Sequence, residues 1–242
     1  MRRILFIAFL FCLALAATAQ IDTTAPTTKI FRPMQTRSKD HLLLQLGGAM
    51  WNNRPDSIKT KGFSRTFNIY LMWDFPFKSS PKLSVALGPG FATDHVFLDK
   101  MTAGIKDNTT SIIFDDRSDT THFKKYKVAT AFLELPIELR FSSNPEADGK
   151  SIKAALGVKV GTMLAAWVKG KGLENASGGT VNEYILKEKS KRFFNTTRIS
   201  ATGRLGYGHF SLFSTYSFTT LFKEGVGPKM NAMSIGLTLS GL

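Results

Sequence analysis

Apolar and polar side chains alternate along much of this chain, most strictly over residues 132–141. Large apolar residues occupy the odd positions there, while Glu134, Glu138 and Arg140 occupy even ones. Because successive side chains of a strand point to opposite faces, this alternation predicts a β-strand with one apolar and one polar face. A helix would spread the same charges around its axis and leave no clean face.

The pattern recurs and predicts eight strands in all. The strand at 132–141 is expected to begin as early as Lys125. The other seven predicted strands are His41–Trp51, Phe63–Phe77, Lys82–Ala92, Ile152–Trp167, Phe194–Tyr207, Phe210–Phe222 and Met230–Leu242. Connections after odd-numbered strands are longer than those after even-numbered ones, an asymmetry typical of outer-membrane barrels.

The N-terminal residues have the three parts of a secretory signal peptide. Arg2 and Arg3 form the basic start, Ile4–Leu15 is the apolar run, and Ala17-Thr18-Ala19 is a small-residue cleavage site. We therefore expect residues 1–19 to be removed on export. The single cysteine of the chain, Cys12, would leave with them.

The remaining chain divides into a polar segment and one domain. Residues 20–39 are polar, with Pro26 and Pro33, and we expect a flexible periplasmic segment there. Residues 40–242 are expected to form the β-barrel domain. After residue 19 the sequence has no apolar run long enough for a transmembrane helix.

The composition of the two faces indicates where the apolar face points. The polar face is mostly Gly, Ala, Ser and Thr with a few charges, which suits the narrow interior of an eight-stranded barrel. A soluble barrel or sandwich, the alternative, would place large apolar residues inside. The sequence thus predicts an all-β fold: an eight-stranded antiparallel up-and-down transmembrane β-barrel with meander topology. We expect it in the outer membrane, with a periplasmic N-terminus and extracellular long loops.

Aromatic residues lie near the predicted strand ends. Trp51 and Trp167 fall at the outer ends of two strands, and Trp73 and Tyr207 at the inner ends of two others. Amphipathic rings favour both water–membrane interfaces, so these four residues are expected to form an aromatic girdle.

The charges on the polar face are the main candidate functional site. We expect a lumenal charge network of Glu134, Glu138, Arg140, Lys153, Lys159, Arg198 and Arg204. Such a network could line a gated polar pore, or it could plug the interior, since unpaired buried charges are costly. The plug is the favoured interpretation.

Catalytic and metal chemistry have weaker candidates. Asp94 and His95, with Asp115 and Asp116, resemble an acid–histidine arrangement, but adjacent strand residues face opposite ways. Asp115, Asp116 and Asp119 lack the spacing of a known calcium loop. We therefore expect no catalytic residue, no metal and no cofactor.

The basic balance of the chain suggests anionic partners. Removing Arg2 and Arg3 from the 32 basic residues leaves 30 against 18 acidic ones, a formal charge of +12. Export argues against nucleic acid, which leaves outer-membrane lipid and lipopolysaccharide as the expected partners. The predicted loop between the fifth and sixth strands is either a lipid-phosphate-binding or a simply hydrated loop. Its basic residues are Lys169, Lys171, Lys187, Lys189, Lys191 and Arg192.

Three short motifs resemble a known family. Leu133-Glu134-Leu135-Pro136, Leu156-Gly157-Val158-Lys159-Val160-Gly161 and Ser234-Ile235-Gly236-Leu237 are similar to segments of PorT-like outer-membrane β-barrel proteins of Bacteroidetes-type bacteria. The resemblance implies an eight-stranded barrel, and the family's namesake serves a secretion and gliding apparatus.

The expected function is accordingly that of a non-enzymatic surface scaffold or interaction protein linked to protein secretion. Its secretion-machinery or surface-protein partner is unknown. The alternatives are a narrow outer-membrane channel for small solutes and a surface barrel enzyme acting on lipid or peptide.

Overall fold

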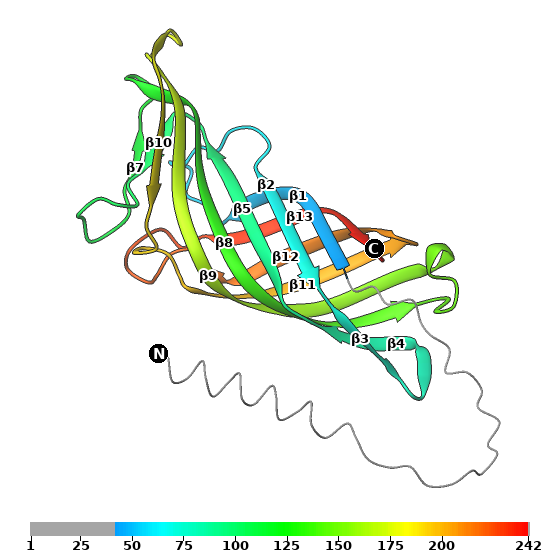
Figure 1. The fold of residues 1–242 in the computed structure, drawn as a ribbon. Helices are drawn as coiled ribbons and strands as arrows, with labels where there is room; N and C mark the ends of the chain where they lie inside the picture. The colour runs from blue at the N-terminus through cyan, green and yellow to red at the C-terminus, as the bar shows by residue number, and fades with distance from the viewer. Residues whose placement is uncertain (1–41, 242) are drawn as a thin grey trace, which may run out of the picture. The chain divides into compact units, whose positions relative to one another are not determined.

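The computed structural model describes residues 42–241, which form an all-β domain (Figure 1). The expected signal peptide, the expected segment 20–39, His41 and Leu242 lie outside the described residues. The predicted all-β class is confirmed. No helix within residues 42–241 is long and apolar enough to cross a membrane.

The strands follow the predicted pattern, with some differences at their ends. Their bounds are β1 (Leu42–Asn52), β2 (Arg65–Leu71), β3 (Trp73–Phe77), β4 (Ser80–Leu87), β5 (Gly90–Leu98), β6 (Met101–Ala103), β7 (Phe114–Asp116), β8 (His122–Ser142), β9 (Ile152–Glu174), β10 (Thr180–Lys189), β11 (Thr197–Tyr207), β12 (Phe210–Thr220) and β13 (Asn231–Ser240). A single 3₁₀ turn, η2 (Asp148–Lys150), interrupts the connection between β8 and β9.

The main sheet closes on itself in a ring of eight antiparallel strands. Its order is β1–β2–β5–β8–β9–β11–β12–β13, and β13 pairs again with β1. The predicted second and third strands each appear as two, β2 with β3 and β4 with β5. Their register continues across the interruptions, since Tyr70 faces Gly90 and Trp73 faces Leu87.

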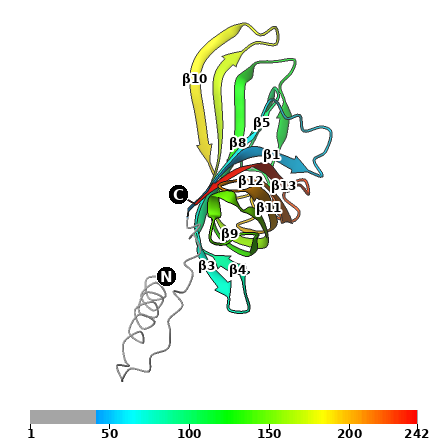
Figure 2. The same ribbon diagram turned by 90° about the vertical axis from the view of Figure 1, so that its right-hand side faces the viewer.

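The two ends of the ring differ in their connections. Residues 78–79, 143–151 and 208–209 make short connections at what we call the turn end. At the opposite loop end, β1 is followed by residues 53–64 and β5 by a segment that contains β6 and β7. Figure 2 shows β10 and the β3–β4 hairpin at opposite ends of the sheet.

Two segments predicted as loops contain strands. Residues 168–191 are not a loop, because β9 continues to Glu174 and turns back as β10, which pairs with it. In residues 168–172 one face carries lysines and the other mostly glycine, so no apolar face marked the strand. The long connection predicted between Ala92 and Lys125 also contains strands: β7 pairs with β6, so that Ala103 faces Phe114.

Burial separates the two faces of the ring. Large apolar residues point outward, with Leu156 72 % and Leu212 62 % exposed. Polar residues point inward, with Gln45 1 % and Lys159 2 % exposed. The sheet therefore has its apolar side outside and its polar side inside, the reverse of a water-soluble barrel.

Leu43, which breaks the alternation of the first strand, lies inside. It is 1 % exposed and packs in a small apolar cluster with Tyr70, Met72 and Ala86. This cluster fills the interior toward the turn end.

A larger apolar core covers the ring at the loop end, and the sequence did not indicate it. We call it the apolar cap. Its rings include Phe194 and Phe222, whose centroids are 5.1 Å apart, and Phe114 stands 6.0 Å from Phe222. The buried members are Ile58, Leu98, Met101, Ala103, Ile105, Ile112, Phe123, Tyr126, Val128, Phe132, Met163, Ala166, Val168, Phe193, Phe194, Leu221, Phe222 and Met230.

Candidate functional site

The first part of the interior site joins β8 to β11 across the strand between them. Glu134 and Arg198 both stand opposite Gly161 of β9 in the register. Because glycine has no side chain, the two can meet above it: Arg198 Nε donates a 2.8 Å hydrogen bond to Glu134 Oε1. Arg198 Nη1 reaches Asp94 Oδ2 of β5 at 2.6 Å. One arginine therefore bridges two carboxylates.

Lys159 carries the contacts to the other side of the ring. Its ammonium donates to Tyr70 Oη at 3.1 Å, and to Gln45 Oε1 and Thr215 Oγ1 at 3.3 Å each. The Tyr70 hydroxyl in turn donates to Glu134 Oε2 at 2.6 Å. With the 3.1 Å bond from Gln45 to the hydroxyl of Thr238 on β13, this network has a member on every strand of the ring.

A second group of charges lies toward the turn end. Arg204 Nη2 donates to Glu138 Oε2 at 2.6 Å, and Arg140 Nε donates to the same oxygen at 3.1 Å. Arg140 Nη1 also lies 3.7 Å from Asp74 Oδ1, which accepts a 2.8 Å bond from Ser84. Four acidic side chains and three arginines thus take part in the interior ion pairs found within residues 42–241, and Lys159 is hydrogen-bonded among them.

Lys153 is the seventh charge expected in the network. It is only half-buried, at the turn end of β9, where it lines a small cavity with Arg140 and Arg204. Tyr70, Asp74 and Gln45 were missing from the expected set. Their position on the inward parity of the first two predicted strands is the signal that could have identified them.

The cavities among the interior charges are the size of single water molecules. One cavity of about 20 Å³ lies among Tyr70, Glu134, Lys159 and Arg198, and another of about 20 Å³ lies beside Lys153. A void needs roughly 10–15 Å³ to hold one water molecule. The described interior therefore has room for single waters between its charged groups, and the apolar cap lies over the loop end.

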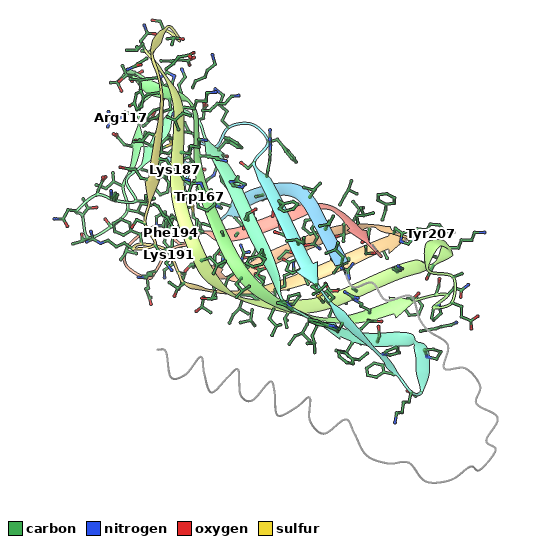
Figure 3. All side chains as sticks on the ribbon, viewed as in Figure 1. Arg117, Trp167, Lys187, Lys191, Phe194 and Tyr207 are labelled. Atoms are coloured by element: carbon green, nitrogen blue, oxygen red, sulfur yellow. The ribbon has the colours of Figure 1, made fainter. Side chains whose placement is uncertain are left out.

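Of the four aromatic residues expected in a girdle, Trp51 lies on the inward side of its strand. Trp167 and Tyr207 lie near opposite ends of the ring (Figure 3), and Trp73 is exposed on the outward face of β3. Trp51 differs from the expectation. It follows the inward parity of Gln45 and packs edge-on against Phe114, 6.4 Å away, because the apolar cap covers that end of β1.

The acidic and histidine residues considered for catalysis do not converge. Asp94 faces inward and pairs with Arg198, whereas His95 packs edge-on against Trp167, 5.9 Å away. Asp115 pairs with Arg117 at 2.6 Å and Asp116 with Lys59 at 2.9 Å.

Asp116 also has a structural role in its segment. Hydrogen bonds from Ser118, and then from Lys59, hold the pKa of the Asp116 carboxyl well below its usual range. The residues that the structure describes contain no group of three side chains placed to hold a metal ion. Asp115 and Asp116 therefore belong to solvated loops held by ion pairs.

No protein-family model matches this chain, and no curated protein matches it. Its function is therefore inferred from the geometry.

Proposed function

We propose that this protein is an outer-membrane β-barrel with a filled interior, acting as a non-enzymatic surface scaffold or interaction protein. The apolar outward face supports the membrane location. Every strand of the ring carries an outward residue that is at least 44 % exposed: Leu46, Phe67, Phe91, Leu135, Leu156, Leu205, Leu212 and Leu237. Water-soluble monomers rarely expose an apolar patch beyond a few hundred Å², whereas hydrocarbon would cover such a belt.

The dimensions of the ring agree with a bilayer. Exposed apolar residues of β8 run from Leu133 to Phe141, close to the roughly 9–11 residues that a tilted transmembrane strand needs. The exposed rings of Trp73 and Tyr207 at the turn end suit a membrane–water interface. Short connections at the turn end and long ones at the loop end would then be periplasmic and extracellular, respectively.

The filled interior is the observation that favours a scaffold over a channel. A conducting pore needs a continuous water path, but the ion-paired network has a member on all eight strands, and the cavities among its charges are water-sized. The interior sets four acidic groups against three arginines and Lys159, which is what a buried plug requires, because an unpaired buried charge would destabilise the fold.

With its interior filled, such a protein would bind partners through its outer surface. Outer-membrane lipid and lipopolysaccharide would contact the apolar belt and the loop end. The resemblance to PorT-like proteins extends the proposal to a role beside protein secretion, with a secretion-machinery or surface-protein partner.

Two measurements on the purified full chain test the proposal. On a denaturing gel, unboiled protein folded in vesicles should run faster than boiled protein, because a closed sheet resists detergent. Equal mobility of the two samples would contradict the barrel.

In planar bilayers the same protein should give no conductance steps, with a 16-stranded porin as the positive control. Regular steps from this chain would overturn the scaffold in favour of the narrow channel.

A further inference from the structure

Six lysines share the outward face of three adjacent strands at the loop end. We call them the lysine face: Lys125, Lys127, Lys169, Lys171, Lys187 and Lys189. They come from β8, β9 and β10, two from each strand. Figure 3 shows Lys187 beside Trp167 at this end.

The strand register lines the lysines up in rows. Lys127 of β8 stands opposite Lys169 of β9, which stands opposite Lys187 of β10. In the next row, Lys125 stands opposite Lys171. Directly opposed residues have Cβ atoms about 4.5–5.5 Å apart, and like charges there destabilise a sheet. The middle row is therefore three positive charges side by side.

Acidic side chains do not compensate this face. Within residues 42–241 none of the six lysines forms an ion pair. Glu174 pairs with Lys124 at 3.2 Å, and Glu188 stands opposite Val168 on the other face. Glu183 lines a surface hollow with Lys125 and Lys171, without an ion pair to either.

The surroundings of Lys127 show the crowding directly. Its side chain is partly buried and lies 3.4 Å from Nδ1 of His95 and 6.0 Å from the centre of the Phe97 ring. Burial first, and then the charges of Lys169 and Arg65, lower the pKa of Lys127, which lies above the apolar belt. A bound anion would relieve this repulsion.

The lysine face lies on the same outward face of β8 and β9 as the apolar belt, nearer the loop end. On β8, Lys127 lies six positions before Leu133, the first exposed apolar residue, with Ala129 and Ala131 between them. At about 3.3 Å per residue this is roughly 20 Å along the strand, or about 15 Å of height at the usual barrel tilt. Trp167 and His95 lie in the intervening row. A ligand with acyl chains on the belt and phosphates above it would meet both surfaces.

We propose that the lysine face binds the phosphate groups of a phosphorylated glycolipid of the outer leaflet, a lipid of the lipopolysaccharide class. This inference rests on the proposed membrane location. The shared outward face with the apolar belt selects a lipid rather than a free anion, and the height of the lysines above the belt selects a phosphate carried on a sugar headgroup. The acyl chains lie against the outward apolar residues of β8 and β9, while Lys127, Lys169 and Lys187 contact the phosphates.

The test uses the full chain folded in neutral phosphatidylcholine vesicles, with folding checked by the gel shift. The probes are bisphosphorylated lipid A, the same lipid without phosphates, and inorganic phosphate. The variant K127Q/K169Q/K187Q removes the middle row. The control K106Q/K223Q/K229Q removes three exposed lysines of other loop-end segments, with the same loss of charge.

Native mass spectrometry should show at least tenfold less bound lipid A for the middle-row variant. The control should differ from the unaltered protein by less than twofold, and dephosphorylated lipid should bind all three proteins equally weakly. Equal losses in both variants would overturn the site in favour of general charge attraction. Saturation by inorganic phosphate, dependent on the same three lysines, would assign a free-anion site instead. A protein that shows no gel shift would contradict the barrel itself, whereas folded protein without lipid preference would contradict only the lysine face.

Discussion

Glu138 lies opposite Gly157 across the β8–β9 pair, and the two backbones approach too closely for any side chain at residue 157. A methyl group there would lie 2.2 Å from the carbonyl oxygen of Ile137 and 2.9 Å from Cα of Glu138. The bare backbone lets Glu138 reach over β9 to Arg204 on β11. Glycine in this strand is thus part of the interior network.

Replacing this glycine should therefore weaken the fold. We expect Gly157→Ala to destabilise the folded protein by about 1–3 kcal/mol, as overpacking generally does. The measurement is a urea titration of vesicle-bound protein, followed by the gel shift. Gly203→Ala is the matched control, since its methyl group would meet nothing closer than Leu156 Cδ2 at 3.4 Å, an ordinary contact. Equal stability of the two variants would contradict the role of Gly157.

Removing one member of the central ion pair should destabilise the fold more than replacing both members by neutral residues. The side chains of Arg198 and Glu134 are 12 % and 2 % exposed, so Arg198→Met would leave a buried carboxylate with fewer partners. Removing one member of a buried pair typically costs about 3–5 kcal/mol. The double variant Glu134→Gln/Arg198→Met should be less destabilised than the sum of the single variants, as a double-mutant cycle can show.

A surface pair provides the comparison for this cycle. Arg117 and Asp115 are about half exposed, so Arg117→Met should change stability by less than about 1 kcal/mol. If Arg198→Met were as mild as Arg117→Met, the interior network would not hold the sheet together.

A charge on the outward face of β8 tests the surroundings of the ring. Leu135 is 45 % exposed within the apolar run of β8. In hydrocarbon, Leu135→Arg should destabilise the folded state by about 2–4 kcal/mol, the usual cost near the bilayer midplane. Leu135→Met should be tolerated. In water the arginine would be harmless at so exposed a position, so full tolerance of Leu135→Arg would argue against a membrane location.

The sequence predicted the ring because alternation is a local property of each strand. Leu135 outside and Glu134 inside follow from a period of two residues, which survives even the interruption at Met72. The same reasoning failed at residues 168–189, where lysines alternate with Val168 and Gly170 and no apolar face marks the strand. Trp51 was misplaced because nothing local reveals the apolar cap above it.

The pairings inside the ring depend on long-range register, which alternation does not fix. Parity placed Lys159 and Lys153 on the same inward face, yet Lys159 is buried while Lys153 lies half-buried at the turn end. The cap has the same origin, since it gathers Ile58, Phe123, Phe194 and Phe222 from separate segments. Contacts of this kind join residues far apart in the chain.

The apolar cap and the ion-paired interior are separate barriers, and one substitution can distinguish them. Phe222 is 1 % exposed and packs against Phe194, so Phe222→Ala should loosen the cap at a cost of about 3–5 kcal/mol. Limited proteolysis should then cut the segment 104–113 faster. The control is Phe63→Ala, which removes an exposed aromatic ring and should leave the cleavage rate unchanged. Because the network of Lys159, Glu134 and Arg198 lies deeper in the ring, Phe222→Ala should still show no conductance in planar bilayers. Conductance in this variant alone would mean that the cap, and not the charged interior, closes the ring.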